Sequence, residues 1–143
     1  MIIIRKADKK DAEQLSSLMS ELIEEPNDPE LVGAELERIA QDDHYFLAVA
    51  CEGDEIVGSV MGTLCRDICK GCRPFLVIEN VITKNGCRGK GVGRLLFEEV
   101  ERWGKERRCA YSMLVSGCGR TGAHAFYEKI GYSRACGFRK YFD

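Results

Sequence analysis

The sequence has no strong excess of either charge and no apolar run long enough to cross a membrane. Lysine and arginine number 21 and aspartate and glutamate 23, so the formal net charge is −2. Proteins that bind nucleic acid or anionic membranes usually carry a basic excess, and a membrane-spanning helix needs about 20 apolar residues. The N-terminus also lacks the pattern of a signal peptide. These absences predict a cytoplasmic protein with neither a nucleic-acid nor a membrane partner.

Cysteine, by contrast, is abundant. Eight cysteines in 143 residues still lie below the density of small disulfide-stapled proteins, so free thiols are expected. Cys65, Cys69 and Cys72 have the C-x3-C-x2-C spacing that radical SAM enzymes use to hold an iron–sulfur cluster, and three thiolates can also bind zinc with a fourth ligand. A radical SAM barrel needs a much longer chain. We therefore expect no metal, and predict an exposed hairpin loop with a basic character.

A glycine-rich loop separates a predicted strand, residues 75–82, from a predicted helix, residues 92–107. The strand is mostly apolar, and the helix has apolar residues at three- and four-residue spacing. The first N–H groups of a helix have no partner within the helix and attract anions. Glycine lets the backbone close around a phosphate, and Arg88, Lys90 and Arg94 add positive charge. The loop therefore predicts a pyrophosphate site.

Two familiar glycine patterns do not fit this loop. A Walker A loop requires lysine where Val92 stands, and a dinucleotide-binding loop requires a third glycine where Arg94 stands. The pattern that fits is [QR]-x-x-G-x-[GA], over residues 88–93. This segment resembles the acetyl-CoA-binding motif of the GNAT superfamily of N-acetyltransferases.

Two further segments carry the same resemblance. Residues 123–132, A-H-A-F-Y-E-K-I-G-Y, resemble the family's A-x-x-F-Y-x-x-x-G-[FY] helix and turn, and residues 4–15 resemble its opening strand and first helix. The resemblance covers nearly the whole chain and implies one N-acetyltransferase domain over residues 1–143. It implies an α/β (α+β) fold, with a mixed, mostly antiparallel sheet of about six or seven strands and about four helices. The implied co-substrate is acetyl-CoA.

Hydrophobic periodicity and capping residues place the remaining elements. Asp8 and Asp11 can cap a first helix, and Asn27 or Asp28, followed by Pro29, can begin a second helix. Further strands are expected at residues 1–6, 44–51, 56–65, 109–115 and 136–142.

The resemblance assigns cofactor contacts to the glycine-rich loop and to the strand before it. The pyrophosphate would lie on Arg88, Gly89, Lys90, Gly91, Val92, Gly93 and Arg94. Main-chain groups of Val81 and Ile82 would bind the pantetheine arm between strands 75–82 and 109–115, and an N–H near Val81 would donate to the thioester oxygen. Many relatives have Asn where this chain has Arg120, so Ser116, Arg120 or His124 is expected to replace that contact.

Two residues are candidates for proton transfer. Alternation along the strand places Phe75, Val77, Glu79 and Val81 on one face, so Glu79 is expected on an apolar stripe. A buried carboxyl group must be paired or have its pKa raised by desolvation, and a raised pKa suits a general base for the acceptor amine. The alternative is that Glu79 only positions substrate. The resemblance places Tyr127 beside the cofactor sulfur as a general acid, with a structural tyrosine as its alternative.

The predicted activity is transfer of an acetyl group from acetyl-CoA to a primary amine of a small molecule or peptide, by direct attack in a ternary complex. No covalent intermediate is needed, so no cysteine is assigned as a nucleophile. Glu21, Glu24 and Glu25 are candidates for contacting a cationic acceptor, because the resemblance places the first two helices beside the acceptor site.

Three alternatives stay open. Residues 78–81, 88–91 and 126–132 are similar to segments of glucosamine-6-phosphate N-acetyltransferase, and the basic loop 65–73 suits a sugar phosphate. A non-catalytic acetyl-CoA-binding module would keep the glycine-rich loop without turnover, and a metal- or redox-sensing protein would use the cysteines. The sequence does not determine the acceptor amine, and a homodimer stays open as the assembly state.

Overall fold

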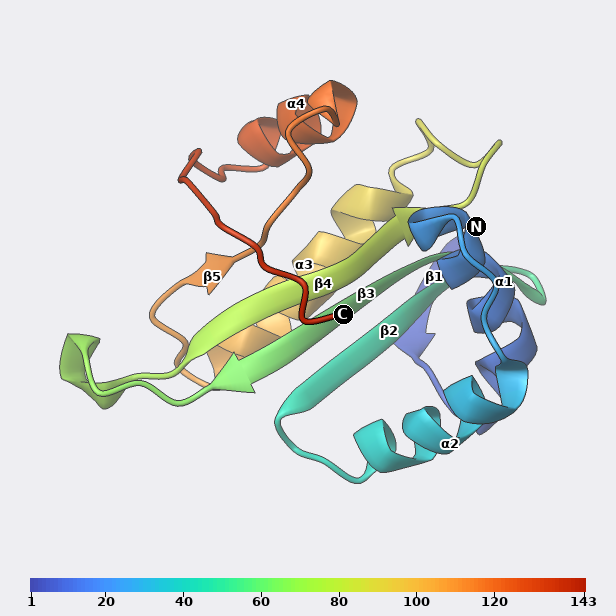
Figure 1. Ribbon diagram of the computed structural model, residues 1–143, viewed down its shortest axis with the longest axis horizontal. Coiled ribbons are helices and arrows are strands. Elements are labelled where there is room, and N and C mark those ends of the chain that lie inside the picture. The colour runs from blue at the N-terminus through green and yellow to red at the C-terminus, as the bar shows by residue number, and fades with distance from the viewer. The chain divides into compact units, whose positions relative to one another are not determined.

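The computed structural model describes residues 1–143, which form two compact units, residues 1–113 and residues 114–143. The first unit is built on a five-stranded sheet in the order β1-β2-β3-β4-β5 (Figure 1). Neighbouring strands are antiparallel, except that β4 and β5 are parallel. The strands are β1 (Ile2–Lys6), β2 (Tyr45–Glu52), β3 (Glu55–Cys65), β4 (Phe75–Thr83) and β5 (Ser112–Met113).

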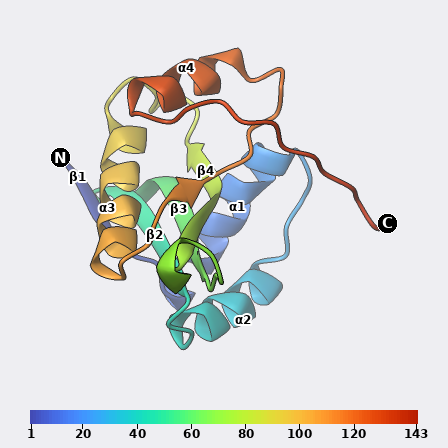
Figure 2. The ribbon, with the colours of Figure 1, turned by 90° about the vertical axis from the view of Figure 1, so that its left-hand side faces the viewer.

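Helices cover both faces of this sheet. α1 (Ala12–Ile23) and α2 (Pro29–Ala40) lie on one face and α3 (Val92–Glu106) lies on the other (Figure 2). There are two short 3-10 turns. The first, η1 (Lys9–Asp11), precedes α1, and the second, η2 (Lys70–Cys72), lies in the β3–β4 hairpin. This is the mixed, mostly antiparallel α/β architecture that the family resemblance implied. None of the helices is at once long enough and apolar enough to span a membrane.

Each face of the sheet has its own apolar layer. The α1 and α2 layer is a cluster of buried residues from both helices and three strands: Leu15, Leu18, Leu36, Val49, Cys51, Ile56 and Ile82. On the other face, α3 approaches β3 closely at two glycines. A Cβ at Gly58 would lie 2.8 Å from Val92 Cγ1, and a Cβ at Gly62 would lie 2.6 Å from Val100 Cγ2. Any side chain at these positions would push α3 away from the sheet.

The second unit contains one helix, α4 (Thr121–Lys129), flanked by segments without regular secondary structure. The predicted strand at residues 136–142 is wrong, and the sheet has five strands rather than six or seven. Phe138, Tyr141 and Phe142 in this tail are exposed, and Arg139 and Lys140 stand between them. An extended tail with this order has no consistently apolar face, so little would be gained by adding it to a sheet.

Aspartates cap the 3-10 turn η1, which leads into α1, and the helix α2, whereas Asp11, the N-cap of α1 itself, makes no side-chain capping bond. The Asp8 side chain accepts a hydrogen bond from the Lys10 N–H at 2.9 Å. The Asp28 side chain accepts one from the Glu30 N–H at 2.9 Å, and Pro29 occupies the first position of α2. In both cases a carboxylate satisfies an N–H group that has no partner within the helix.

Asp11 links the start of α1 to the edge strand β1. Its side chain is 4% exposed, and its two oxygens each accept a hydrogen bond of 2.8 Å from the Arg5 guanidinium. A third hydrogen bond, 2.9 Å long, comes from the Asp8 N–H. The Arg5 contact lowers the pKa of Asp11 below its ordinary value, in spite of the desolvation that burial causes.

Replacing Asp11 with asparagine is expected to lower the free energy of unfolding at pH 7 by about 2 kcal/mol, because hydrogen bonds to a charged group are lost. The folded pKa lies below the unfolded value of about 3.9, so the wild type keeps this contribution above that value and loses it as pH falls through the folded pKa. Urea unfolding measured between pH 7 and pH 2 would therefore show that the free energy of unfolding falls less on acidification in the variant than in the wild type. The exposed Glu13→Gln variant of the same helix should follow the wild type. An unchanged pH dependence in Asp11→Asn would contradict the assignment.

Candidate active site

The phosphate loop, residues 84–91, connects the C-terminal end of β4 to α3 (Figure 1). Gly86, Gly89 and Gly91 have φ angles of 86°, 82° and 81°, in the left-handed region that favours glycine. No atom lies within 4 Å of a Cβ built on Gly86 or Gly89, so these positions face open space. Gly91 is the N-cap of α3, and its N-terminus has no side-chain cap. The first N–H groups of α3 are therefore available to an anion.

The side chains of the loop and of the first helical turn differ in what they contact. Arg88 is exposed, and Lys90 Nζ lies 4.0 Å from a carboxylate oxygen of Glu52. Arg94 forms an ion pair of 2.6 Å within α3. Val92 is a core residue, 1% exposed, so only its main chain is available to a ligand. Two of the three predicted cations are thus partly neutralised before any ligand binds.

A β-bulge interrupts β4 just before the phosphate loop. Met61 of β3 pairs with Glu79, whereas Ser59 pairs with Ile82, so β4 has one residue more than β3 between these pairs. Asn80 in the bulge has a φ of 54°, which is unusual for a residue with a side chain. A bulge leaves backbone groups outside the regular ladder. The main chain at Val81, which the family resemblance assigned to the cofactor, lies within this irregularity.

The bulge corrects the predicted alternation of β4. Ser59 and Met61 are two residues apart and share one face of β3, so their partners Ile82 and Glu79 also share a face. Ile82 belongs to the apolar cluster under α1 and α2. Regular alternation had placed Val81, rather than Ile82, with Glu79. The extra residue shifts everything beyond Asn80 to the opposite face.

Glu79 is exposed, so the expectation that it lies buried on an apolar stripe is wrong. The buried residues of β4 are Leu76, Ile78 and Ile82, and the side of the strand that carries Glu79 is open before the bulge. The burial on which the argument for a general base was built is therefore absent at this position. Whether Glu79 acts as a base or positions substrate stays a prediction.

Ser59 is a residue of this region that sequence reasoning missed. Its side chain is completely buried, and its hydroxyl donates a hydrogen bond of 2.9 Å to the Asn80 carbonyl oxygen. The only signal in the sequence is a serine within the apolar run of residues 56–65, which is too common to indicate a function. The contact depends on the register of β3 and β4.

The strand after α3 is shorter than predicted. Pairing was expected over residues 109–115, but β5 pairs with β4 only at Leu76 and Val77. Pro74 and Leu76 make two further main-chain hydrogen bonds to the segment before β5, of 2.8 Å and 3.0 Å. No strand of the first unit therefore pairs with β4 along the edge that continues to Val81.

One of the predicted acceptor-site acids contacts the phosphate loop. A carboxylate oxygen of Glu21, on α1, accepts a hydrogen bond of 3.4 Å from the Asn85 N–H. Glu24 ends α1 in the left-handed conformation, with a φ of 57°, and Glu25 follows it. All three glutamates are exposed. The loop between α1 and α2 thus carries negative charge at the phosphate-loop end of the sheet.

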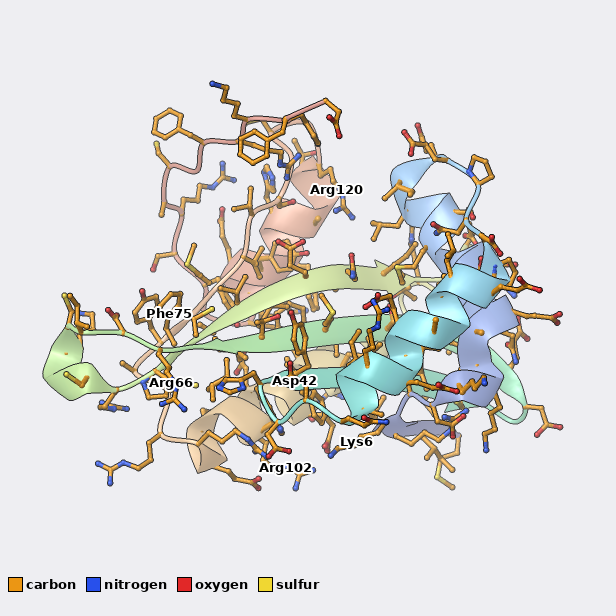
Figure 3. All side chains as sticks on the ribbon, turned by 60° about the horizontal axis from the view of Figure 1, so that its bottom comes forward. Lys6, Asp42, Arg66, Phe75, Arg102 and Arg120 are labelled. Carbon is orange, nitrogen blue, oxygen red and sulfur yellow. The ribbon has the colours of Figure 1, made fainter.

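The basic hairpin, residues 65–73, lies at the other end of β4. Figure 1 shows η2 and the phosphate loop at opposite ends of that strand, and Figure 3 shows Arg66 and Phe75 together at the η2 end. Asn80 lies five positions after Phe75, which is about 17 Å along a strand. Arg73 donates hydrogen bonds of 3.0 Å to the Arg108 and Cys109 carbonyls. The hairpin cations do not join the phosphate loop.

All eight cysteines are free thiols, as predicted. Cys69 and Cys72 are exposed and Cys65 is half-buried. No group of three or more histidine, cysteine or acidic side chains is arranged to hold a metal ion. Burial raises the pKa of the Cys109 thiol, and the nearby Arg107 and Arg73 charges offset part of that rise.

In the second unit, Tyr127 lies on α4 and is 9% exposed. Burial raises the pKa of its phenol above the ordinary value, and the charge of Arg120 offsets part of that rise. The Tyr127 ring packs edge-on against Phe126 and Tyr132, with centroids 5.6 Å and 6.4 Å away. This environment keeps the phenol protonated near neutral pH, as a general acid requires.

The segment before α4 contains the other predicted contacts. Ser116 Oγ is buried and has no hydrogen-bond partner. Arg120 is the N-cap residue of α4 but makes no side-chain capping bond. His124 Nε2 lies 2.8 Å from the Gly117 carbonyl oxygen, so this histidine has a structural contact within its own unit. Whether Ser116 or Arg120 contacts the cofactor stays a prediction.

Known proteins resemble this chain in sequence and in fold. An uncharacterized N-acetyltransferase, YhdJ, of Bacillus subtilis is 34% identical over 118 residues, covering 81% of this chain and 80% of that protein. An aminoglycoside N(6')-acetyltransferase type 1 of Salmonella enteritidis is 28% identical over 132 residues, covering 90% of each. A solved putative acetyltransferase from Agrobacterium tumefaciens superposes with a TM-score of 0.89 at 26% identity, covering 97% of this chain and 99% of that one.

The sequence profile of the acetyltransferase (GNAT) family matches residues 12–132, which include both motifs found in the sequence. The phosphate loop and the bulged β4 strand lie within the matched region. The chain therefore belongs to the acetyltransferase (GNAT) family and is an N-acetyltransferase.

Proposed function

We propose that this protein transfers the acetyl group of acetyl-CoA to a primary amine of a small, cationic molecule, by direct attack in a ternary complex. The phosphate loop carries the proposal. Three left-handed glycines and the uncapped N-terminus of α3 form an open backbone cradle beside Arg88 and Lys90. Such a cradle suits the pyrophosphate of acetyl-CoA. Residues 88–94 would hold that group.

Two other features fit the rest of the cofactor. The buried Ser116 hydroxyl has no partner, and such a group is rare in a folded protein unless a ligand or water completes it. Main-chain groups of Val81 and Ile82 lie at and just beyond the bulge of β4, along an edge that β5 does not cover. These groups would bind the pantetheine arm, and an N–H near Val81 would donate to the thioester oxygen.

The proposed chemical steps combine these groups with the roles that the family resemblance assigns to Glu79 and Tyr127. Glu79, or a water molecule that it orients, takes a proton from the acceptor ammonium, and the amine nitrogen then attacks the thioester carbon. The oxygen of the tetrahedral intermediate accepts a hydrogen bond from main chain near Val81. When the carbon–sulfur bond breaks, Tyr127 gives its proton to the departing CoA sulfur. The second proton that the attacking nitrogen loses on becoming an amide passes through water to the Tyr127 phenolate, which restores the general acid.

A polycationic amino sugar is the acceptor class that the observations favour. The Salmonella enteritidis relative is named an aminoglycoside N(6')-acetyltransferase. Glu21, Glu24 and Glu25 are exposed carboxylates at the phosphate-loop end of the sheet, and such groups suit a substrate with several ammonium groups. A sugar phosphate has less support, since the basic hairpin lies at the opposite end of β4 and Arg73 is occupied by main-chain carbonyls.

The proposal is tested in two stages with the reduced protein. Calorimetric titration with acetyl-CoA and with CoA should give dissociation constants in the micromolar range. A panel of aminoglycosides, polyamines, peptides, glucosamine and glucosamine 6-phosphate is then followed by mass spectrometry, because eight protein thiols would obscure a thiol assay. We expect the fastest acetylation with aminoglycosides. Binding without turnover on any amine would point to a non-catalytic acetyl-CoA-binding module, and a higher rate with glucosamine 6-phosphate than with glucosamine would favour the sugar-phosphate alternative.

A further inference from the structure

We infer that Ser59 is a positioning residue, whose hydroxyl fixes the orientation of the Val81 N–H for acetyl transfer. The inference rests on the proposed function, because the Val81 N–H meets a thioester oxygen only if the protein binds acetyl-CoA and transfers its acetyl group. Ser59 is on β3, is 0% exposed, and donates a hydrogen bond of 2.9 Å to the Asn80 carbonyl oxygen.

The geometry of the peptide bond connects these two residues to Val81. The Asn80 carbonyl and the Val81 N–H belong to one peptide unit, which is trans, since the chain has no cis peptide bond. A trans peptide unit is planar, and its C=O and N–H point in opposite directions. The Ser59 hydroxyl holds the carbonyl toward β3. It therefore holds the Val81 N–H away from β3, toward the other edge of β4.

That other edge is where a ligand would enter. β5 pairs with β4 only at Leu76 and Val77, so no strand of the first unit accepts a hydrogen bond from β4 at Val81. An N–H that points out of an uncovered strand edge has no acceptor within the sheet and can donate a hydrogen bond to a ligand. The thioester oxygen of acetyl-CoA is the acceptor that the proposed reaction supplies.

The Ser59 hydrogen bond matters because the bulge leaves the Asn80–Val81 peptide unit with fewer restraints from neighbouring hydrogen bonds. Asn80 has a left-handed φ of 54°, and the regular ladder is interrupted at this position. An interrupted ladder restrains the peptide unit less than continuous pairing does, because neighbouring hydrogen bonds no longer fix its rotation. The buried hydroxyl is therefore the contact that keeps this peptide unit in a single orientation, before substrate arrives.

Replacing Ser59 with alanine should lower kcat for acetyl transfer about 10- to 100-fold, because loss of one oxyanion donor costs about 100- to 1,000-fold and a misoriented donor retains part of its effect. KM for acetyl-CoA should change less than about threefold, because the pyrophosphate contacts supply most of the binding. Relaxation-dispersion NMR of the Val81 amide, without substrate, should show conformational exchange in the variant and none in the wild type. Ser59→Thr, which keeps the hydroxyl, should restore most of kcat.

A matched control separates this role from a general loss of stability. Val100→Ala removes two methyl groups from a fully buried residue on α3, on the other face of the sheet. It should lower the unfolding temperature at least as much as Ser59→Ala, while kcat stays within about twofold of wild type. If Ser59→Ala retains the wild-type kcat and its Val81 amide shows no conformational exchange, the inference is wrong. If the wild type acetylates no amine, the proposed function fails first, and the relaxation-dispersion experiment still decides whether Ser59 orders the bulge.

Discussion

Replacing Gly91 with glutamate is expected to weaken acetyl-CoA binding at least about 100-fold, a loss of about 2.7 kcal/mol. Gly91 has a φ of 81°, and a residue with a side chain pays about 1–2 kcal/mol for this conformation. The substitution also brings a negative charge to the N-terminus of α3, where the proposal places the pyrophosphate. Strain of the cradle and repulsion of the ligand therefore act in the same direction.

Gly71→Glu is the control for this substitution. Gly71 has a φ of 70° in η2, and no atom lies within 4 Å of a Cβ built there, so the change introduces a similar strain and the same charge. It does so at the opposite end of β4 (Figure 1). Calorimetric titration should show acetyl-CoA affinity within about twofold of wild type for Gly71→Glu. Equal affinities for both variants would mean that the phosphate loop is not the site of the pyrophosphate.

Replacing Tyr127 with phenylalanine is expected to lower kcat about 100- to 1,000-fold, which is within the range for loss of a general acid. Phenylalanine keeps the ring that packs against Phe126 and Tyr132 and removes only the hydroxyl. The dissociation constant for acetyl-CoA should therefore stay within about threefold of wild type. Single-turnover acetylation, followed by mass spectrometry, separates the chemical step from binding.

The pH dependence of kcat in the wild type is a second test of Tyr127 as the general acid. Burial raises the pKa of the Tyr127 phenol above its ordinary value, so this group remains a proton donor through pH 9. No fall in kcat between pH 7 and pH 9 should arise from it. Tyr132→Phe is the matched control, because it removes a hydroxyl from the neighbouring ring. Loss of activity in Tyr132→Phe, with Tyr127→Phe fully active, would reverse the assignment.

Local signals in the sequence predicted α1, α2, α3 and the first four strands, whereas α4 was expected from the resemblance of residues 123–132 to the family motif. Asp28 followed by Pro29 marks the start of α2, and the three- and four-residue spacing of apolar side chains predicted α3 from Val92, where the structure begins it. The phosphate loop was predicted because its glycines, cations and following helix are contiguous in the chain. Gly86, Gly89 and Gly91 have left-handed φ angles, while phosphate binding by this loop stays a prediction.

The errors concern pairing between distant segments. Regular alternation cannot reveal a bulge, since the extra residue near Asn80 is defined only by its opposite strand. The expected burial of Glu79 was wrong because no element packs over that position in the first unit. The expected strand at 136–142 was wrong because apolar residues in a tail do not pair unless a sheet edge and a consistent face are both available.

The sequence alone placed the glycine-rich loop and the boundaries of α3 and the first four strands, because caps, periodicity and turn residues act within a few residues of the chain, and its motifs carried the family resemblance. The tertiary structure alone decided the register of β3 against β4, and with it the contact between Ser59 and Asn80. The Ser59 hydroxyl and the Asn80 carbonyl are 21 residues apart in the chain. They meet only when β3 and β4 pair with one extra residue on β4. That alignment depends on the packing of both sheet faces, which no local pattern records.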